Sequence, residues 1–213
     1  MIQIAHRGYS DKYGDNNIES FLEAIRCGFD MIEMDIQLCK TGEIVVFHDT
    51  YVNNCSIVDY TLKELNEKNI ITLESIFNAI KINHHIKIYL DIKGSGDVIY
   101  PLIDMLRNHF SQMQLRRIYI SGFNRNFVKP LLESKLPVCI GLTTENMYDK
   151  EDLDYLTKNM NFVCLHWTAL NHENIDMLHQ KGIIVYSYTC KDAFILQYMK
   201  QYKLDGIVTN YLL

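Results

Sequence analysis

The sequence predicts an α/β fold, a (β/α)8 TIM barrel of eight parallel strands joined by helices. Short apolar segments typical of strands alternate with longer segments of helical period along most of the chain. Charged and histidine side chains recur directly after these strands, at the end of such a barrel where active sites lie. The expected strands begin at Ile2, Met31, Ile86, Arg117, Val138, Phe162, Ile183 and Gly206.

The N-terminal part of the chain predicts a strand, a loop and a helix. Residues 2–5 form a short apolar strand that ends at His6. The polar residues that follow predict a loop, since glycine, serine, aspartate and asparagine favour turns. An asparagine at position 16 or 17 can cap a helix over residues 18–27, and Gly28 would end that helix.

The stretch from residue 31 to residue 49 organises the predicted site. In its first half, acidic and apolar residues alternate, so that Glu33 and Asp35 share one face of a strand and apolar side chains share the other. Two neighbouring acids repel each other unless a cation or basic groups lie between them, and Mg2+ or Ca2+ favour oxygen ligands. After a turn, a short apolar segment at residues 44–47 brings His48 within reach of the carboxylates. We expect this segment to lie outside the barrel.

The region from residue 51 to residue 80 predicts a connection to the third barrel strand. Residues 51–59 predict a loop, and residues 61–67 predict a short helix. Thr72 can cap a second helix whose apolar side chains point inward.

The strand at residues 86–92 repeats the pattern of the central stretch. Asp91 and Lys93 are two residues apart and therefore share one face near its end. His84 and His85 precede this strand, at the end of the barrel opposite the site. We expect them to lie in a solvated loop.

Helices and strands alternate regularly in the second half of the chain. The expected helices span residues 98–110, 124–134, 150–159, 171–180 and 192–202. Too few residues follow the last strand for a full eighth outer helix. We therefore expect another element or a second subunit, as in a homodimer, to cover the outer face near the first and last strands.

Composition limits the classes of function. The chain has 213 residues, 48% hydrophobic and 22% charged, which predicts a single globular domain over residues 1–213. A formal net charge of -5 gives no reason to expect a nucleic-acid partner. No segment has the pattern of a signal peptide or of a membrane span, so a soluble cytoplasmic protein is expected. The six cysteines lack zinc-site spacing and are expected to be reduced.

Several ordered motifs resemble the glycerophosphodiester phosphodiesterase family, which is similar to phosphatidylinositol-specific phospholipase C and sphingomyelinase D. The resemblance runs over nearly the whole chain. The motifs are His6-Arg7-Gly8, Gly28-x-Asp30-x-Ile32-Glu33-x-Asp35, Thr41-Gly42-x-Ile44-Val45-Val46-x-His48-Asp49, Thr72-Leu73-Glu74, Leu90-Asp91-Ile92-Lys93, Ile120-Ser121-x-Phe123 and Asp205-Gly206-Ile207-Val208-Thr209-Asn210.

The resemblance implies roles for seven side chains. His6 and His48 would be the acid/base pair, and Arg7 and Lys93 would contact the substrate phosphate. Three carboxylates would ligate one divalent cation, Mg2+ or Ca2+: Glu33, Asp35 and Asp91. Chemistry agrees, because three carboxylates suit a hard cation and a phosphodiester needs positive charge on its oxygens as it reacts.

The chain departs from the family pattern at two places in the site. It reads Gly14-Asp15-Asn16-Asn17 where the family usually has Pro-Glu-Asn-Thr. Asp91 replaces the glutamate that is common as third ligand in glycerophosphodiesterases, and matches sphingomyelinase D-like enzymes instead.

These residues predict a metal-dependent phosphodiesterase that hydrolyses glycerophosphodiesters, as small-molecule substrates, to an alcohol and glycerol phosphate. We expect His6 to act as base and His48 as acid. Alternatives are a sphingomyelinase D-like or lysophospholipase D-like lipid phosphodiesterase, or a catalytically silent barrel that binds a phosphorylated ligand. His166, Trp167 and Tyr188 follow later strands and are pocket candidates, although Trp167 could equally cap the barrel core.

Overall fold

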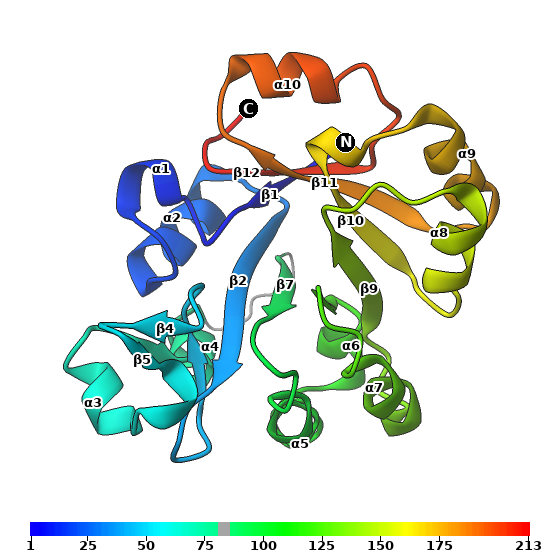
Figure 1. The fold of residues 1–213 in the computed structure, drawn as a ribbon. Coiled ribbons are helices and arrows are strands. Elements are labelled where there is room, and N and C mark those ends of the chain that lie inside the picture. Colours follow the sequence, from blue (N-terminus) through cyan, green and yellow to red (C-terminus); the bar gives the residue numbers. More distant parts are fainter. Residues whose placement is uncertain (81–85) are drawn as a thin grey trace.

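The computed structural model describes residues 1–80 and 86–213 (Figure 1). The expectation of a solvated loop at His84 and His85 lies outside these residues. Among the described helices, none is both long enough and apolar enough to cross a membrane.

Eight parallel strands close into a barrel, which confirms the predicted TIM-barrel fold. The first strand pairs with the last and also with the second, so the barrel has no open edge between them. Around the barrel the order is β1 (Ile2–Ala5), β12 (Gly206–Thr209), β11 (Ile184–Cys190), β10 (Phe162–His166), β9 (Cys139–Thr144), β8 (Ile118–Gly122), β7 (Lys87–Ile92) and β2 (Met31–Leu38).

Helices connect the strands on the outside of the barrel (Figure 1). Asn17 caps α2 (Ile18–Cys27) as the sequence predicts, accepting the Ser20 amide, and Gly28 ends this helix in a left-handed conformation with φ +90°. The predicted helix at residues 124–134 begins later, at Val128, because the Asn124 side chain accepts the Asn126 amide and forms a turn first. The connecting helices are α2 (Ile18–Cys27), α4 (Leu73–Ile80), α5 (Ile99–His109), α7 (Val128–Ser134), α8 (Lys150–Leu156), α9 (His172–Gln180) and α10 (Ala193–Met199).

No helix follows β12 within the described part of the chain. The C-terminal tail itself packs there, since Tyr211 contacts the apolar clusters of both halves of the barrel. The Leu213 amide donates to the Gln3 side chain over 2.7 Å, which ties the tail to β1. Part of the outer face beside the first and last strands is therefore covered by this chain.

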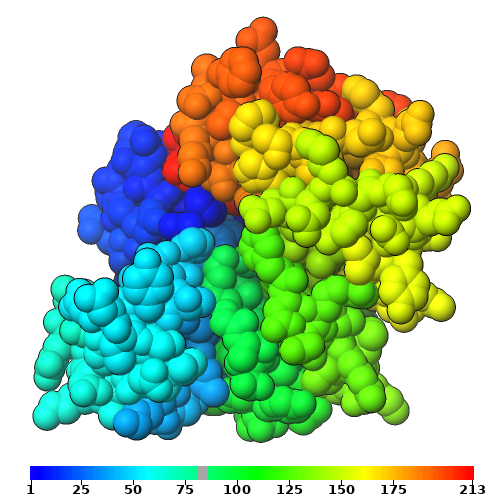
Figure 2. All heavy atoms as spheres, in the orientation of Figure 1, coloured from blue at the N-terminus to red at the C-terminus, as the bar shows by residue number. Residues whose placement is uncertain are grey.

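An insertion follows β2 and forms the cyan lobe beside the barrel (Figure 2). β3 (Ile44–Val46) pairs antiparallel with β2, as an addition to the barrel sheet, and β6 (Ile71–Thr72) pairs with β3. The expectation of a plain loop at residues 51–59 is wrong, because this segment contains a hairpin. Asn53 and Asn54 both have positive φ, as the two-residue turn of a tight hairpin requires. The insertion contains β3 (Ile44–Val46), β4 (Tyr51–Val52), β5 (Cys55–Ser56), α3 (Leu62–Asn66) and β6 (Ile71–Thr72).

Aromatic side chains fill the barrel interior. Phe162 is fully buried and makes edge contacts with Tyr89 and Tyr119, with ring centroids about 5.5 Å apart. Gly141 leaves room for this ring, because a Cβ there would lie 2.5 Å from it. The apolar filling forms a floor below the polar residues at the strand ends.

Candidate active site

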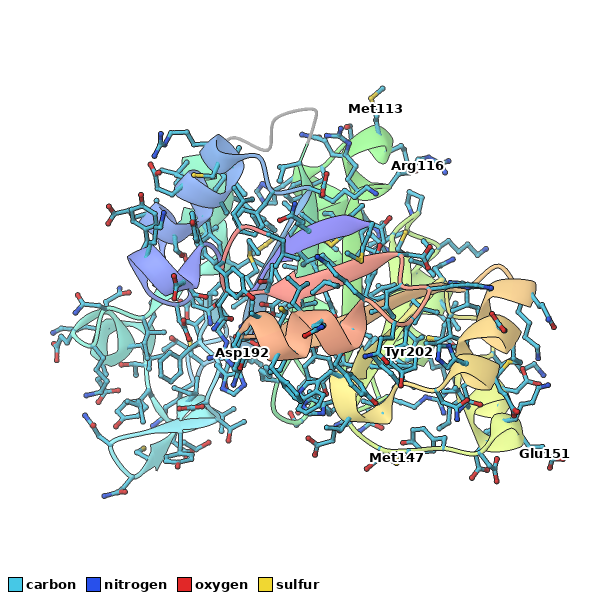
Figure 3. All side chains as sticks on the ribbon, turned by 90° about the horizontal axis from the view of Figure 1, so that it is seen from above. Met113, Arg116, Met147, Glu151, Asp192 and Tyr202 are labelled. Atoms are coloured by element: carbon cyan, nitrogen blue, oxygen red, sulfur yellow. The ribbon has the colours of Figure 1, made fainter. Side chains whose placement is uncertain are left out.

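One cavity of about 130 Å³ gathers most of the predicted site residues at the carboxyl ends of the strands. Figure 3 shows Met147, which follows β9, at the opposite edge of the molecule from Met113 and Arg116, which precede β8. The cavity is lined by His6, Arg7, Glu33, Asp35, His48, Tyr89, Asp91, Lys93, Phe123, Thr143, Cys164, Tyr188, Thr189, Lys191 and Val208.

The three predicted carboxylate ligands come together in the barrel. Alternation along β2 places Glu33 and Asp35 on the inward face, and the register of β2 with β7 sets Asp91 directly beside Asp35. All three are buried, and one carboxylate oxygen from each lies within 4.8 Å of the others. Burial raises the pKa of Glu33 well above its usual value, and the nearby charges of Asp35 and Asp91 add to this effect. A hard divalent cation fits this donor set, since it would neutralise charges that otherwise repel one another.

Two basic side chains touch the acids. Lys93 Nζ lies 2.5 Å from Asp91 Oδ2 and 3.0 Å from Asp35 Oδ1. Arg7 donates its backbone N–H to Glu33 Oε2 over 2.8 Å, and its Nε lies 3.2 Å from Asp35 Oδ2. Burial opposes ionisation of Asp35, but Lys93 and Arg7 outweigh it and lower the pKa of that carboxyl.

The loop that departs from the family pattern still supports the site. Asp15 Oδ2 accepts from Arg7 Nη1 over 2.7 Å. Asn16 is buried with a left-handed φ of +53°, a conformation that asparagine tolerates, and its Nδ2 donates to Asp35 Oδ2 over 2.8 Å. The shorter acid and the absent proline therefore leave Arg7 and Asp35 supported.

His6 is held in one tautomer by the last barrel strand. Its Nδ1 lies 2.7 Å from the amide oxygen of Asn210, which can only accept, so Nδ1 carries the proton. Nε2 is then left with a lone pair. Burial lowers the pKa of His6 to about 4, and the charge of Arg7 contributes to this lowering. The ring is therefore neutral near pH 7, which suits a general base.

His48 reaches the same cavity through the insertion. The Phe47 amide donates to the Asp35 carbonyl oxygen over 3.0 Å, which fixes the chain just before His48 beside β2. Gln37 holds the other side, because its Nε2 donates to the carbonyl oxygens of Phe47 and Asp49. His48 Nδ1 donates to the Asp49 carboxylate over 2.7 Å, which leaves Nε2 of the ring available for reaction.

The aromatic pocket candidates divide into two groups. Tyr188 lines the cavity, and its buried hydroxyl has no hydrogen-bond partner among residues 1–80 and 86–213. His166 and Trp167 are not among the lining residues; the His166 ring lies 5.3 Å from Tyr188 and 5.6 Å from Trp167. Phe123 is half exposed, and its ring contacts both the Tyr188 ring and the Lys93 ammonium.

Six lining residues were not predicted as site residues from the sequence: Tyr89, Thr143, Cys164, Thr189, Lys191 and Val208. Thr143 is the last residue but one of β9, so its position near a strand end was the available signal. Tyr89 lies in the middle of β7, where an inward-facing tyrosine would be taken for core packing. Lys191 directly follows β11.

Comparison with known proteins agrees with this geometry. The model of the glycerophosphoryl diester phosphodiesterase family matches residues 6–213. A glycerophosphodiester phosphodiesterase of Caldanaerobacter subterraneus is 27% identical, over 97% of this chain and 93% of its own length.

Two solved structures share the fold. A glycerophosphodiester phosphodiesterase from Thermotoga maritima superposes with a TM-score of 0.80 at 24% identity, covering 99% of this chain and 94% of that one. A phosphodiesterase from Oleispira antarctica was solved in complex with the product sn-glycerol-3-phosphate. It superposes with a TM-score of 0.83 at 21% identity, covering 99% of this chain and 93% of that one. Because the family model spans almost all of the barrel and its insertion, this chain belongs to the glycerophosphoryl diester phosphodiesterase family.

Proposed function

We propose that the protein is a metal-dependent phosphoric diester hydrolase that cleaves glycerophosphodiesters to glycerol phosphate and an alcohol. The observation that carries this proposal is the convergence of His6, His48 and three buried carboxylates on one cavity. A silent ligand-binding barrel would not need two histidines whose hydrogen bonds leave Nε2 of each ring available. The relatives with this activity in their names support the same conclusion.

The three carboxylates would hold the cation, whose chemistry when bound is to polarise a phosphoryl oxygen. Glu33, Asp35 and Asp91 are the donors, as the sequence predicts. Arg7 and Lys93, which lie beside these carboxylates, would bind the phosphate group of the substrate. Arg7 Nε is buried without a hydrogen-bond partner in the described chain, and Lys93 has a third N–H beyond those facing the two acids.

The two histidines would move the protons of the reaction. His6 Nε2 takes the proton of the attacking hydroxyl, from water or from the neighbouring glycerol hydroxyl, while Asn210 holds Nδ1. His48 Nε2 gives a proton to the departing alkoxide, which is a poor leaving group without it. Asp49 orients the His48 ring for this step.

A substrate panel tests the proposed activity. We expect purified protein with Mg2+ to release glycerol phosphate from water-soluble glycerophosphodiesters, and the product can be measured enzymatically. Lysophospholipids and sphingomyelin form the second arm. Activity confined to that arm would favour the lipid phosphodiesterase alternative, which the half-exposed Phe123 at the cavity supports. Binding of these compounds without any turnover would instead identify a silent barrel.

The lowered pKa of His6 predicts an unusual pH profile. The base must be neutral to accept a proton, so kcat/KM should fall only as pH drops through about 4, well below the ordinary histidine value of about 6.5. Saturating Mg2+ keeps the three carboxylates of the proposed cation site occupied during the assay. Titration of the His6 ring by NMR measures the same value directly.

An Asn210→Asp variant provides the control for this profile. A carboxylate at Nδ1 favours the charged ring, so the acid limb of kcat/KM should move to higher pH. An acid limb that stays near 6.5 in both proteins would rule out His6 as the base.

Three further expectations stay predictions. They are that residues 1–213 act as one domain, that the protein works in the cytoplasm without a nucleic-acid partner, and that another element or a second subunit, as in a homodimer, covers the outer face near β1 and β12. The packing of Tyr211 reduces the need for a second subunit over β1 and β12, because this side chain already covers part of that face.

A further inference from the structure

A network of buried hydroxyl groups lies beneath the acidic cluster and ends on one of its carboxylates. Tyr89 Oη lies 2.7 Å from Ser121 Oγ, and Ser121 Oγ lies 2.5 Å from Thr143 Oγ1. Thr143 Oγ1 donates to Asp91 Oδ1 over 3.1 Å, whereas the contact from Ser121 is longer, at 3.4 Å. All four side chains are buried, and they come from the three adjacent strands β7, β8 and β9.

The direction of this network follows from its final acceptor. An ionised carboxylate can only accept, so Thr143 gives its proton to Asp91. Thr143 can then accept from Ser121, with Ser121 accepting from Tyr89, or it can accept directly from Tyr89, whose Oη lies 2.9 Å from Thr143 Oγ1. In either arrangement the donors run from Tyr89 through Thr143 to Asp91, and each bond polarises the next. Asp91 Oδ1 is therefore held by a hydrogen bond to a buried hydroxyl group of the barrel interior.

The other two carboxylates are restrained in the same way. Glu33 Oε2 accepts the backbone N–H of Arg7, and Asp35 Oδ2 accepts from the buried Asn16 amide. Each of the three acids therefore has one oxygen engaged by a fixed donor. The second oxygens of Asp35 and Asp91 face Lys93, a flexible side chain that can yield to a bound cation.

We propose that these fixed donors hold each carboxylate to one available oxygen, and so make the cation site selective for an ion of the Mg2+ class over Ca2+. Ca2+ takes about six to eight oxygen ligands and often binds carboxylates through both oxygens. Mg2+ accepts single carboxylate oxygens and keeps water or phosphate oxygens for its other positions. This inference rests on the proposed function, because it presumes that the acids bind a cation. Thr143, Ser121 and Tyr89 are then positioning residues for Asp91.

Binding of each metal alone, measured by calorimetry without substrate, tests this inference. We expect the wild-type protein to bind Mg2+ at least as tightly as Ca2+. A Ser121→Ala/Thr143→Val variant frees Asp91 Oδ1; both changes are needed because Ser121 lies close enough to replace the lost donor. The ratio of Ca2+ affinity to Mg2+ affinity should rise about tenfold, the usual scale for partners of metal ligands.

Two matched variants separate this effect from a loss of packing. Thr143→Ser keeps the hydroxyl and should keep the wild-type ratio. Thr144→Val alters the next buried threonine of β9, whose hydroxyl accepts the Asn146 amide instead, and should also leave the ratio unchanged.

The outcomes distinguish this inference from the proposed function. If the double variant binds both ions with the wild-type ratio, the selectivity inference fails and the metal site stands. If the wild-type protein binds neither ion, both fail. Should the double variant not fold, Tyr89→Phe removes only the first donor and should shift the ratio in the same direction by a smaller factor. An unchanged ratio in Tyr89→Phe would then overturn the inference.

Discussion

Replacing His6 or His48 by alanine is expected to lower kcat by about 10²- to 10⁴-fold, the range for loss of a general acid or base. The fold should survive, because His48 is partly exposed just after β3 and the side chain of His6 makes one hydrogen bond, to Asn210. His109→Ala is the matched control, since this histidine is exposed on α5 away from the cavity. Turnover by the two site variants is compared with that of the control at saturating Mg2+.

A substrate whose leaving group needs no proton distinguishes the acid role from the base role of the two histidines. A nitrophenyl phosphodiester releases a stable phenolate that needs no proton, so His48→Ala should recover most of its activity on this substrate. His6→Ala should stay impaired, because the attacking hydroxyl still has to lose its proton. If His6→Ala recovered activity on this substrate and His48→Ala did not, His6 would be the acid and His48 the base. Undiminished turnover of His48→Ala on the natural type of substrate would remove it from the mechanism.

Removing the divalent cation is expected to have the other large effect. Chelation should lower activity by about 10³-fold, because a bound cation supplies several kcal/mol of transition-state stabilisation. Added Mg2+ should restore it. Activity that is indifferent to chelation would contradict the assignment of the three carboxylates.

Glu33→Gln tests the cation site through the thermal stability of the protein with and without metal. This substitution keeps the shape and an oxygen for the Arg7 amide but removes a buried negative charge from beside Asp35 and Asp91. Without metal the variant should melt higher than the wild type, by about 2–4 °C for each kcal/mol of relieved repulsion. With Mg2+ at about 100 times its dissociation constant, the wild type should gain about 2.7 kcal/mol and the variant little.

The matched control for this substitution is Glu74→Gln. Glu74 is exposed in the first turn of α4, outside the cavity, although it belongs to one of the family motifs. Its variant should respond to Mg2+ like the wild type. If Glu33→Gln gained as much stability from Mg2+ as this control, Glu33 would not be a ligand.

Local sequence pattern predicted most of the fold and the inward-facing acids. Alternation in β2 is a property of neighbouring residues, so it placed Glu33 and Asp35 on one face before any tertiary contact was known. The asparagine cap of α2 and its terminal glycine also depend on a few adjacent residues. The hairpin at residues 51–56 was missed because its strands are only two residues long, too short for a periodicity signal.

The roles of the motif residues came from their resemblance to a family, and the tertiary structure supplied their partners. Asn210 fixes the tautomer of His6 from 204 residues away, a pairing that no local pattern contains. The hydroxyl chain onto Asp91 likewise depends on the register of three strands that helices separate in the chain.

The sequence by itself therefore determined the strand order and the chemical character of the site, because backbone period and side-chain type are local properties. Only the closed barrel decided which oxygen of each acid accepts a hydrogen bond from a neighbouring donor and which nitrogen of His6 carries the proton. Those choices are made by hydrogen bonds between strands, and such bonds exist only once the strands are in register.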